Sequence, residues 1–507
     1  MTLADAEVDG RAEARRVAAI VQRLTVVAPF LDETLDADAI VASRGPGPLL
    51  DALIHRVAES LDLHGIWVLL AATTGAFPLA DHVRSARRAL AVSPVAQRFS
   101  AFLRTASDLA VRSEGLESHI EVVSGGVVAD VDFCARHLHN TGIQRVVRQT
   151  VPRWTGQSSL TLAGWTDRGT AMRTLAPQER RRVVDWNTAK HEDPEPVPDT
   201  PPTLVLPIGS TVAVVEVPRA ELCAPLAALA EFSRNRVVAI GYDAIPVVSA
   251  DTVPAAETER FVQYLTLIKH IDTVAAISES VREEFAGFAS SVRPQGLVGP
   301  QSIAVTLPVD APDARPASRA AQASSPLVLC VGSQEPRKNH DAVLYASEVL
   351  WREGLDFRLR FIGRGSLWFT KGFDKRVAAL AKAGRDVAVL RGIDDEQMLS
   401  MYREARFTVF PSLQEGYGLP VAESIAERTP VITTAYGSTG EIARDGGCLT
   451  IDPRDDESIV AAMRRLLTDD ELEAELLAQI DRRPRRSWDD YASELWSVLQ
   501  PAEEVAR

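Results

Sequence analysis

The chain begins with about 120 residues in which apolar side chains recur at three- and four-residue spacing. Segments 12–24 and 48–61 show this pattern with charged residues between the apolar positions, which predicts amphipathic helices. Clear strand patterns are scarce before residue 122. We therefore expect residues 1–120 to form a mostly α-helical accessory domain, and no motif in it carries recognisable chemistry.

From Val127 onwards, short β-rich runs alternate with helical segments. Two of those helices are predicted over 143–154 and 257–270. Strands that alternate with helices predict a parallel sheet covered on both faces, which is an α/β fold. The expected strands of this first sheet are 127–133, 160–165, 203–208, 211–217, 236–242 and 273–278.

A second series of the same kind starts at 327–332, an apolar run that ends in Gly332. Its further strands are expected at 358–363, 387–392, 407–412, 430–434 and 448–452, with a final helix at 488–499. The stretch 310–325 is rich in Ala, Ser and Pro, as interdomain linkers are. We thus predict an N-terminal Rossmann-like domain over 121–315 and a C-terminal one over 316–484.

The most apolar stretch is 66–79, which is shorter than the ~20 residues that a membrane-spanning helix needs. Gly75 and Pro78 interrupt it, so we expect a buried helix and its turn. The first 16 residues mix both charge signs and lack the apolar core of a secretory signal. The expected location is the cytoplasm, and attachment to the inner face of a membrane stays open.

The composition excludes several classes of protein. Lys and Arg number 55 and Asp and Glu number 69, so the net charge is −14 and the basic surplus of a nucleic-acid binder is missing. The 4 cysteines lie far apart and form no C-x-x-C pair. This spacing argues against a zinc ribbon or a disulfide scaffold and fits a reducing compartment.

A first candidate site is the segment VGSQEPRKNH, residues 331–340. A strand ends at Gly332, a turn follows, and a helix is expected to begin near Arg337. Gly lets a ligand approach the backbone closely, and a helix N-terminus with Arg337 and Lys338 beside it suits a phosphate. A surface turn with solvated cations is the alternative, which the strand–turn–helix setting makes less favourable.

A second candidate is PSLQEGYGLPVAES, residues 411–424, in which seven residues separate Glu415 from Glu423. Gly416 and Gly418 make the loop permissive, and Glu423 is expected in the first turn of the following helix. A carboxylate there can accept two hydroxyl protons at once, as a ribose or hexose diol requires. Alone, Glu423 could instead interact with the helix dipole, and Glu415 could be a solvated loop acid.

The other motifs are weaker. Residues 438–441, STGE, fit a capping box at the start of a helix. Residues 139–145, HNTGIQR, lead into a helix of the first sheet, and residues 241–246, GYDAIP, end one of its strands. Asp243 would face the cleft between the domains, although an Asx turn is as good an explanation. The D-x-D of residues 130–132 sits within an expected strand, and we assign no metal to it.

Together these motifs resemble the family-4 (group 1) glycosyltransferases, which have the GT-B fold of two Rossmann-like domains facing a cleft. The carriers are VGSQEPRKN, FPSLQEGYGLPVAES, STGE and the late Trp488 helix, with TGIQRVV and YDAIP in the first half. The resemblance covers about 127–499 and does not extend to the first 120 residues. It implies that the segment 485–507 packs back toward the N-terminal half.

The resemblance implies a role for each motif residue. Arg337 and Lys338 would hold the donor diphosphate, and Glu423 would bind the ribose. Glu415 would lie near the transferred sugar, and Asp243 is the further candidate for catalysis. The remaining expected donor contacts are Gly332, Gly416, Tyr417, Gly418 and Leu419, and the expected acceptor cleft consists of Gly142, Arg145, Tyr242 and Asp243.

The sequence departs from the family pattern at two of these places. Tyr242 stands where a His often precedes the Asp, which puts the role of that His in doubt. Gln144 replaces the second Gly of the loop, which changes how closely a ligand can approach.

The reaction that this resemblance implies is transfer of a hexose, mannose or similar, from a nucleoside-diphosphate sugar to a glycan or lipid-linked acceptor in polysaccharide biosynthesis. It would be retaining and need no metal or other cofactor. A non-catalytic nucleotide-sugar or glycan-binding subunit and a sugar-nucleotide 2-epimerase of the same fold remain alternatives. A NAD-dependent dehydrogenase is less favoured, because no G-x-G-x-x-G opens a helix after the first strand of either sheet.

Overall fold

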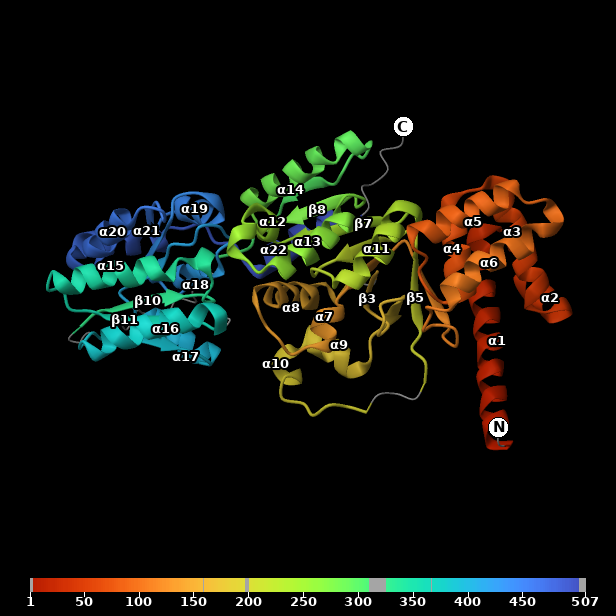
Figure 1. The fold of residues 1–507 in the computed structure, drawn as a ribbon, viewed down its shortest axis with the longest axis horizontal. Helices are drawn as coiled ribbons and strands as arrows, with labels where there is room; N and C mark the ends of the chain where they lie inside the picture. Colours follow the sequence, from red (N-terminus) through yellow and green to blue (C-terminus); the bar gives the residue numbers. More distant parts are fainter. Residues whose placement is uncertain (1–2, 158, 197–199, 310–324, 366, 501–507) are drawn as a thin grey trace.

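The computed structural model describes residues 3–157, 159–196, 200–309, 325–365 and 367–500. Three units follow one another along the molecule in Figure 1: helices at one end, a first sheet in the middle and a second sheet at the other end. The expected linker at 310–325 lies outside the described residues, except for Ser325. The prediction of two sheet domains preceded by a helical part is confirmed.

The N-terminal unit is helical, as its periodicity predicts. Residues 66–72 of its fourth helix are at most 2% exposed, so the most apolar stretch of the chain is a buried core helix, as expected. No helix in the described part of the chain combines the length and the apolar character needed to cross a membrane. The helices are α1 (Leu3–Leu31), α2 (Ala37–Arg44), α3 (Pro46–Ser60), α4 (Leu63–Thr74), α5 (Ala80–Val92) and α6 (Arg98–Ala110).

Arg23 of α1 fastens this unit to the strand that follows it. Its buried guanidinium donates to the carbonyl oxygens of Ala72, Gly115 and Ser118 at 2.7–2.9 Å. Burial lowers the pKa of Arg23 to about 10, so it remains charged at neutral pH. One arginine thereby joins α1, α4 and the connection to the first sheet.

The first sheet has the strand order β1-β5-β4-β3-β2-β6-β7-β8-β9 within the described residues. All neighbours are parallel except β4, which runs antiparallel to β3 and β5, so the expected fully parallel sheet is wrong at this hairpin. The sheet also begins earlier than expected, because β1 pairs with β5. The strands are β1 (Ile120–Ser124), β2 (Val127–Asp130), β3 (Leu160–Trp165), β4 (Met172–Thr174), β5 (Leu204–Ile208), β6 (Thr211–Val214), β7 (Arg236–Gly241), β8 (Thr273–Ala276) and β9 (Gln301–Ala304).

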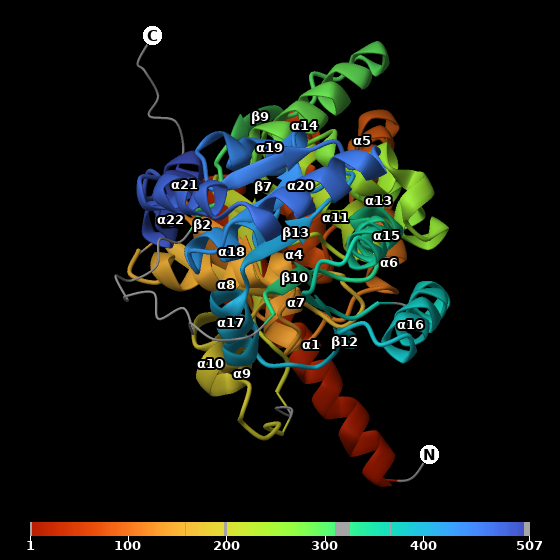
Figure 2. The same cartoon turned by 90° about the vertical axis from the view of Figure 1, so that its left-hand side faces the viewer.

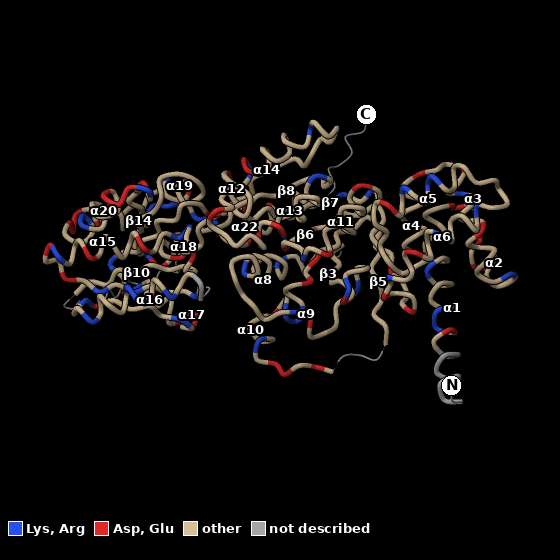
Figure 3. Tube along the Cα trace, in the orientation of Figure 1, with Lys and Arg blue, Asp and Glu red and all other residues tan. Residues whose placement is uncertain are grey.

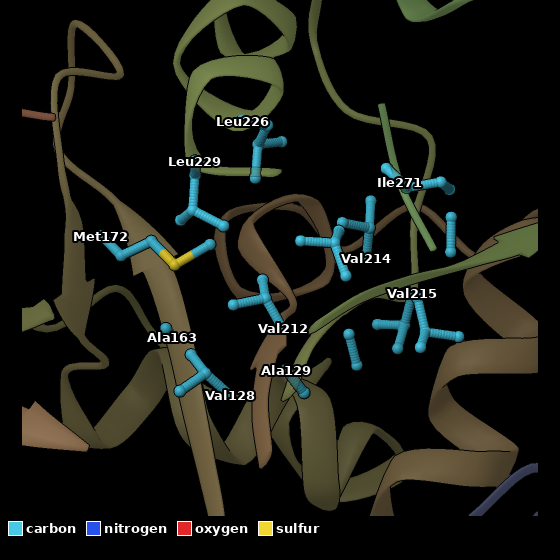
Figure 4. Packing of buried hydrophobic residues seen from close by; sticks show 14 of the residues in the cluster. Val128, Ala129, Ala163, Met172, Val212, Val214, Val215, Leu226, Leu229 and Ile271 are labelled. Carbon is cyan, nitrogen blue, oxygen red and sulfur yellow. The ribbon is translucent and has the colours of Figure 1, made fainter. Parts of the chain in front are cut away.

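Every residue of β2, β5, β6 and β8 is buried. Because successive side chains of a strand point to opposite faces, both faces of this sheet are covered. Figure 4 shows part of this core, where Val128, Val212 and Val214 lie among side chains of neighbouring strands and helices. The covering helices are α7 (Asp132–Arg136), α8 (Gly142–Trp154), α9 (Pro177–Val184), α10 (Trp186–Ala189), α11 (Ala220–Phe232), α12 (Ile245–Val248), α13 (Ala255–Ile268) and α14 (Glu279–Ser291).

The second sheet is parallel throughout, in the order β12-β11-β10-β13-β14-β15. Numbered from its first strand this is 3-2-1-4-5-6, the order of a doubly wound Rossmann sheet. Its strands are β10 (Leu327–Val331), β11 (Arg358–Ile362), β12 (Val387–Leu390), β13 (Phe407–Phe410), β14 (Val431–Thr434) and β15 (Cys448–Ile451). Its helices are α15 (His340–Arg352), α16 (Leu367–Lys382), α17 (Asp395–Glu404), α18 (Leu419–Ala426), α19 (Gly437–Arg444), α20 (Asp456–Thr468) and α21 (Asp470–Asp481).

The last helix, α22 (Trp488–Leu499), leaves the second sheet and packs on α8 of the first. The buried Trp154 of α8 donates its indole N–H to the carbonyl oxygen of Ala492 at 2.9 Å, and its ring lies 5.5 Å from that of Trp496. Figure 1 shows α22 in the middle unit, away from α20 and α21 of the second sheet, whereas α21 and α22 overlap in the rotated view of Figure 2. The chain therefore passes from the first sheet to the second and back.

Three carboxyl groups are buried beside the end of β2: those of Asp130, Asp132 and Glu216. The D-x-D motif was expected within a strand, which is wrong for Asp132. β2 ends at Asp130, and Asp132 opens α7. Asp130 accepts from Trp165 Nε1 at 2.8 Å, and Glu216 accepts from the backbone N–H of Phe133 and Cys134. Within the described residues no three His, Cys, Asp or Glu side chains are grouped so that they could hold a metal ion.

Asp130 and Glu216 make stability depend on pH. Burial, helped by neighbouring carboxylates, raises the pKa of Asp130 and of Glu216 to about 7. The folded chain then holds protons that the unfolded chain has released, so stability falls as pH rises from about 4 to 7. Between pH 6 and 8 each group costs about 1 kcal/mol. We expect Asp130→Asn to reduce this loss of unfolding free energy in denaturant titrations, whereas an unchanged pH dependence would contradict the assignment.

Candidate active site

Two loops follow the strands at which the order of the second sheet reverses. β10 continues to β11 on one side, and its neighbour β13 continues to β14 on the other. Doubly wound sheets bind ligands in the crevice outside the carboxyl ends of strands at such a reversal. The segments 331–340 and 411–424 leave β10 and β13 there. The fold thus brings the two strongest sequence motifs to one edge.

The first loop differs from the expected strand–turn–helix. Residues Pro336–Lys338 form a short 3-10 turn, and Asn339 adopts the left-handed conformation with φ +56° before α15 begins at His340. A helix start near Arg337 is therefore wrong. Arg337 and Lys338 project from the turn, and a phosphate would meet their side chains rather than the amides of a helix N-terminus.

Both cations converge on Glu415. Lys338 Nζ is hydrogen-bonded to Oε1 of Glu415, and Arg337 Nη1 lies 3.0 Å from Oε2. The Lys338 ammonium also sits 5.0 Å from the centre of the Phe410 ring. Less than 10% of the Lys338 and Glu415 side chains is exposed. The three charged groups form one buried cluster between the ends of β10 and β13.

The pKa values of this cluster follow from burial and pairing. Burial lowers the pKa of Lys338, although the attraction of Glu415 opposes it. Burial would raise the pKa of Glu415, but Lys338 and Arg337 outweigh it, so this pKa lies below its usual value. Arg337 also pairs with Glu335 at 3.1 Å, so two carboxylates match the two cations, and an incoming anion would compete with these carboxylates for Arg337 and Lys338.

Asp243 faces the cluster from the first sheet, where it follows β7. Burial raises its pKa, and the nearby Arg337 guanidinium opposes this. Its carboxylate accepts from the backbone N–H of Ile245 at 3.1 Å, so the Asx turn expected as the alternative forms as well. Asp243 therefore shapes its own loop and also contributes to the field at Arg337.

Glu423 takes part in a second charged contact between the sheets. It is the fifth residue of α18, so its expected place in the first turn is wrong, and its side chain does not serve the helix start. Oε1 pairs with Arg145 of α8, and Oε2 accepts from the Tyr402 hydroxyl at 3.0 Å. Burial raises the pKa of Glu423, and the guanidinium of Arg145 opposes this.

The two units are in close backbone contact beside the cluster. A Cβ added to Gly416 would lie 2.1 Å from the carbonyl oxygen of Tyr242, so only glycine allows this approach. The Ser278 hydroxyl donates to the carbonyl oxygen of Gly416 at 2.7 Å. Gly142, at the start of α8, would place a Cβ 3.3 Å from Leu419 of α18. Gly142, Gly416 and Leu419 thus lie at the boundary between the sheets.

The remaining expected site residues are positioned differently. Tyr242 is buried and donates its hydroxyl to the carbonyl oxygen of Val215 at 2.7 Å, so its ring points into the first sheet. Tyr417 donates to the carbonyl oxygen of Leu307 at 2.7 Å. Gly418 has φ +109° directly before α18, and Gly332 has φ +155° after β10. These residues shape the loops, while the side chains of both tyrosines bond elsewhere.

Several residues of this boundary carry no sequence signal. Tyr402 is spaced like an ordinary core residue of α17. Gln414 donates to Glu284 of α14 and accepts from Ser249. His340 is buried beside Lys338 with no partner among the described residues for either ring nitrogen, and burial with this cation lowers its pKa to about 3. A neutral imidazole therefore sits next to the cationic cluster.

The capping box expected at 438–441 is wrong. α19 begins at Gly437 after Tyr436, and Ser438 donates instead to the carbonyl oxygen of Glu415 at 2.9 Å. Glu441 reaches α14 of the other unit, where it accepts from the backbone N–H of Glu279 and Ser280 at 3.0 and 2.7 Å. A carboxylate is well placed at that helix N-terminus, which now links the two units.

Comparison with known proteins adds a family likeness for one part of the chain. Residues 313–483 match the model of the family described as glycosyl transferases group 1. The serotype-specific mannosyltransferase WbdA of Escherichia coli is 26% identical over 334 residues, which cover 63% of this chain and 39% of that protein. The chain thus spans well under half the length of this curated relative.

Solved structures share the fold. Sucrose-phosphate synthase of Thermosynechococcus elongatus has a TM-score of 0.52 at 17% identity and covers 74% of this chain and 98% of its own. Anabaena HepE, solved in complex with UDP and glucose, has a TM-score of 0.52 at 10% identity and covers 74% of this chain and 99% of its own. The expected GT-B arrangement of two sheets is confirmed by these likenesses.

Proposed function

We propose that this protein is a retaining glycosyltransferase of group 1. It would move a hexose such as mannose from a nucleoside-diphosphate sugar to a hydroxyl of a glycan or lipid-linked acceptor, without a metal or another cofactor. The observation that carries the proposal is the buried meeting of Arg337 and Lys338 with Glu415 at the strand-order reversal. The match of 313–483 to the group 1 model supports it.

The chemistry of transfer requires a diphosphate to leave as its negative charge grows. Arg337 and Lys338 are fixed by Glu415 before the donor arrives, so they need not reorganise when that charge develops. They interact more strongly with the departing diphosphate than with the bound donor, which lowers the barrier. In this proposal the leaving phosphate shields one face of the oxocarbenium-like sugar, the acceptor hydroxyl enters on the same face, and the anomeric configuration is retained.

Glu423 has a second role in the proposal. Its carboxylate would accept two hydroxyl protons of the donor ribose, but Arg145 and Tyr402 occupy both oxygens here. Each carboxylate oxygen can accept a second hydrogen bond, so the diol would either bind beside these partners or displace the Arg145 guanidinium, which comes from the first sheet. Displacement would change a contact between the two units.

The proposal is tested by incubating the full chain with GDP- and UDP-sugars and a panel of glycan and lipid-linked acceptors. We expect release of nucleoside diphosphate that depends on the acceptor, persists with a chelator and gives a product with the anomeric configuration of the donor by NMR. A product formed from donor alone would favour the epimerase. Donor binding without turnover on any acceptor would favour a non-catalytic subunit.

Glu423→Gln should weaken binding of the matching nucleoside diphosphate about 10- to 100-fold, because hydrogen bonds from hydroxyls to a neutral amide replace those to a carboxylate. Isothermal titration calorimetry measures this directly. Glu427→Gln is the matched control, since Glu427 directly follows α18 and also forms an ion pair, with Arg403. Equal affinity of the Glu423→Gln and wild-type chains would remove Glu423 from the donor site.

A further inference from the structure

The helical unit contains a stretch of single charge sign in an otherwise acidic protein. Residues 82–107 include five arginines and neither Asp nor Glu, although the whole chain has a net charge of −14. The arginines are Arg84, Arg87, Arg88, Arg98 and Arg104. In Figure 3, positive and negative residues are both scattered over the rest of the trace. The stretch therefore stands out by charge before its structure is considered.

This stretch forms a helical hairpin. α5 and α6 pack against each other and are joined by the short connection 93–97, so they run antiparallel. Their buried faces contain Val83, Ala86 and Leu90 on α5 and Phe102 and Leu109 on α6. At the turn, Val92 is 82% exposed and Val95 is 61% exposed. The hairpin thus ends in an apolar tip that no described part of the chain covers.

Most of the arginines of the hairpin are not neutralised. Arg84 pairs with Glu231 at 2.7 Å and ties the hairpin to α11 of the first sheet. Arg87, Arg88 and Arg104 are exposed and form no ion pair with any residue that the structure describes. Surface arginines elsewhere in the protein often are paired, as Arg464 is with Glu353. The three free cations lie behind the apolar tip along both helices.

We propose that the tip of the α5–α6 hairpin docks on the surface of a bilayer that contains anionic lipids. Val92 and Val95 would enter the boundary between headgroups and acyl chains, and Arg87, Arg88 and Arg104 would meet lipid phosphates. Val92 is four positions after Arg88, which is about 6 Å of helix, so the cations lie at headgroup depth when the valines reach the boundary. This order of apolar tip and set-back cations matches a bilayer, in which an apolar layer lies beneath anionic headgroups over the whole surface.

The test uses the full chain and sedimentation with vesicles. Phosphatidylcholine vesicles are compared with vesicles in which about one third of the lipid is phosphatidylglycerol. We expect binding to the anionic vesicles that weakens in high salt and little binding to the neutral ones. Arg87→Gln/Arg88→Gln should lower the partition coefficient about thirty-fold, and Val92→Ser/Val95→Ser should lower it several-fold without changing its salt dependence.

The matched control is Lys371→Gln/Lys375→Gln, which removes two exposed cations from α16 at the opposite end of the molecule. It should bind the anionic vesicles like the wild type. Equal binding to both kinds of vesicle, or full binding by the arginine variant, would overturn the proposal. So would binding to heparin or an acidic protein that depends on Arg87 and Arg88 while anionic vesicles are ignored. All substituted positions are exposed, and the melting temperature verifies folding.

Discussion

Lys338→Ala is expected to lower kcat/KM for sugar transfer by about 10²- to 10³-fold, the cost of losing one preorganised donor to a developing oxyanion. The ammonium group is buried and held by Glu415, so water cannot take its place without rearranging the cluster. The effect should fall mainly on kcat, because the diphosphate gains charge as the glycosidic bond breaks. Initial rates at varied donor concentration separate the two parameters.

Two further variants make this result interpretable. Arg337→Ala should behave similarly, since its guanidinium shares Glu415 with Lys338. Lys371→Ala removes an exposed lysine of the same unit and should leave the rates unchanged. Turnover near that of the wild type in both Lys338→Ala and Arg337→Ala, with melting temperatures showing intact folding, would refute the assigned role.

Gly416→Ala should cause the second large loss, of about 100-fold or more in kcat/KM, because a misplacement of about 1 Å at a reacting centre can cost that much. The new methyl group would lie 2.1 Å from the carbonyl oxygen of Tyr242, so the second unit must move away from the first. The Ser278 hydrogen bond to Gly416 would lengthen with it. Small-angle scattering should show a larger radius of gyration.

Gly287→Ala is the matched substitution. Gly287 lies in α14, and a Cβ there would meet nothing within 4 Å. Alanine should therefore stabilise the protein by up to about 1 kcal/mol and leave activity unchanged. Full activity and an unchanged radius of gyration in Gly416→Ala would show that the contact with Tyr242 does not position the site.

The sequence predicted those features that depend on local periodicity. Alternation of strands and helices gave both sheets, and strand ends placed the segments 331–340 and 411–424 at one edge, because carboxyl ends of parallel strands lie together. The antiparallel β4 was missed, since a three-residue strand has too little pattern to be recognised. The start of α15 was misplaced because Pro336, a residue type that suits the first turn of a helix, begins a 3-10 turn instead.

Within the site, the sequence identified most of the charged residues but not the distant residues that they contact. Arg337, Lys338 and Glu415 were singled out, and they do meet. Arg145 with Glu423, and Glu441 with the start of α14, join residues far apart in the chain, and no local pattern reports such pairs. Tyr242 was placed at the cleft, yet its hydroxyl bonds to the core, because a loop pattern does not fix a rotamer.

The return of α22 to α8 has a mechanical consequence. The chain crosses between the sheet units twice: the segment before β10 joins them covalently, and the segment after α21 leads to α22, which packs noncovalently on α8. After a single backbone cut between β9 and β10, noncovalent contacts such as α22 on α8 and the Trp154 bond to Ala492 would hold the two pieces together. In size-exclusion chromatography a nicked chain would then still elute at its original size, and its two fragments would separate only in denaturant.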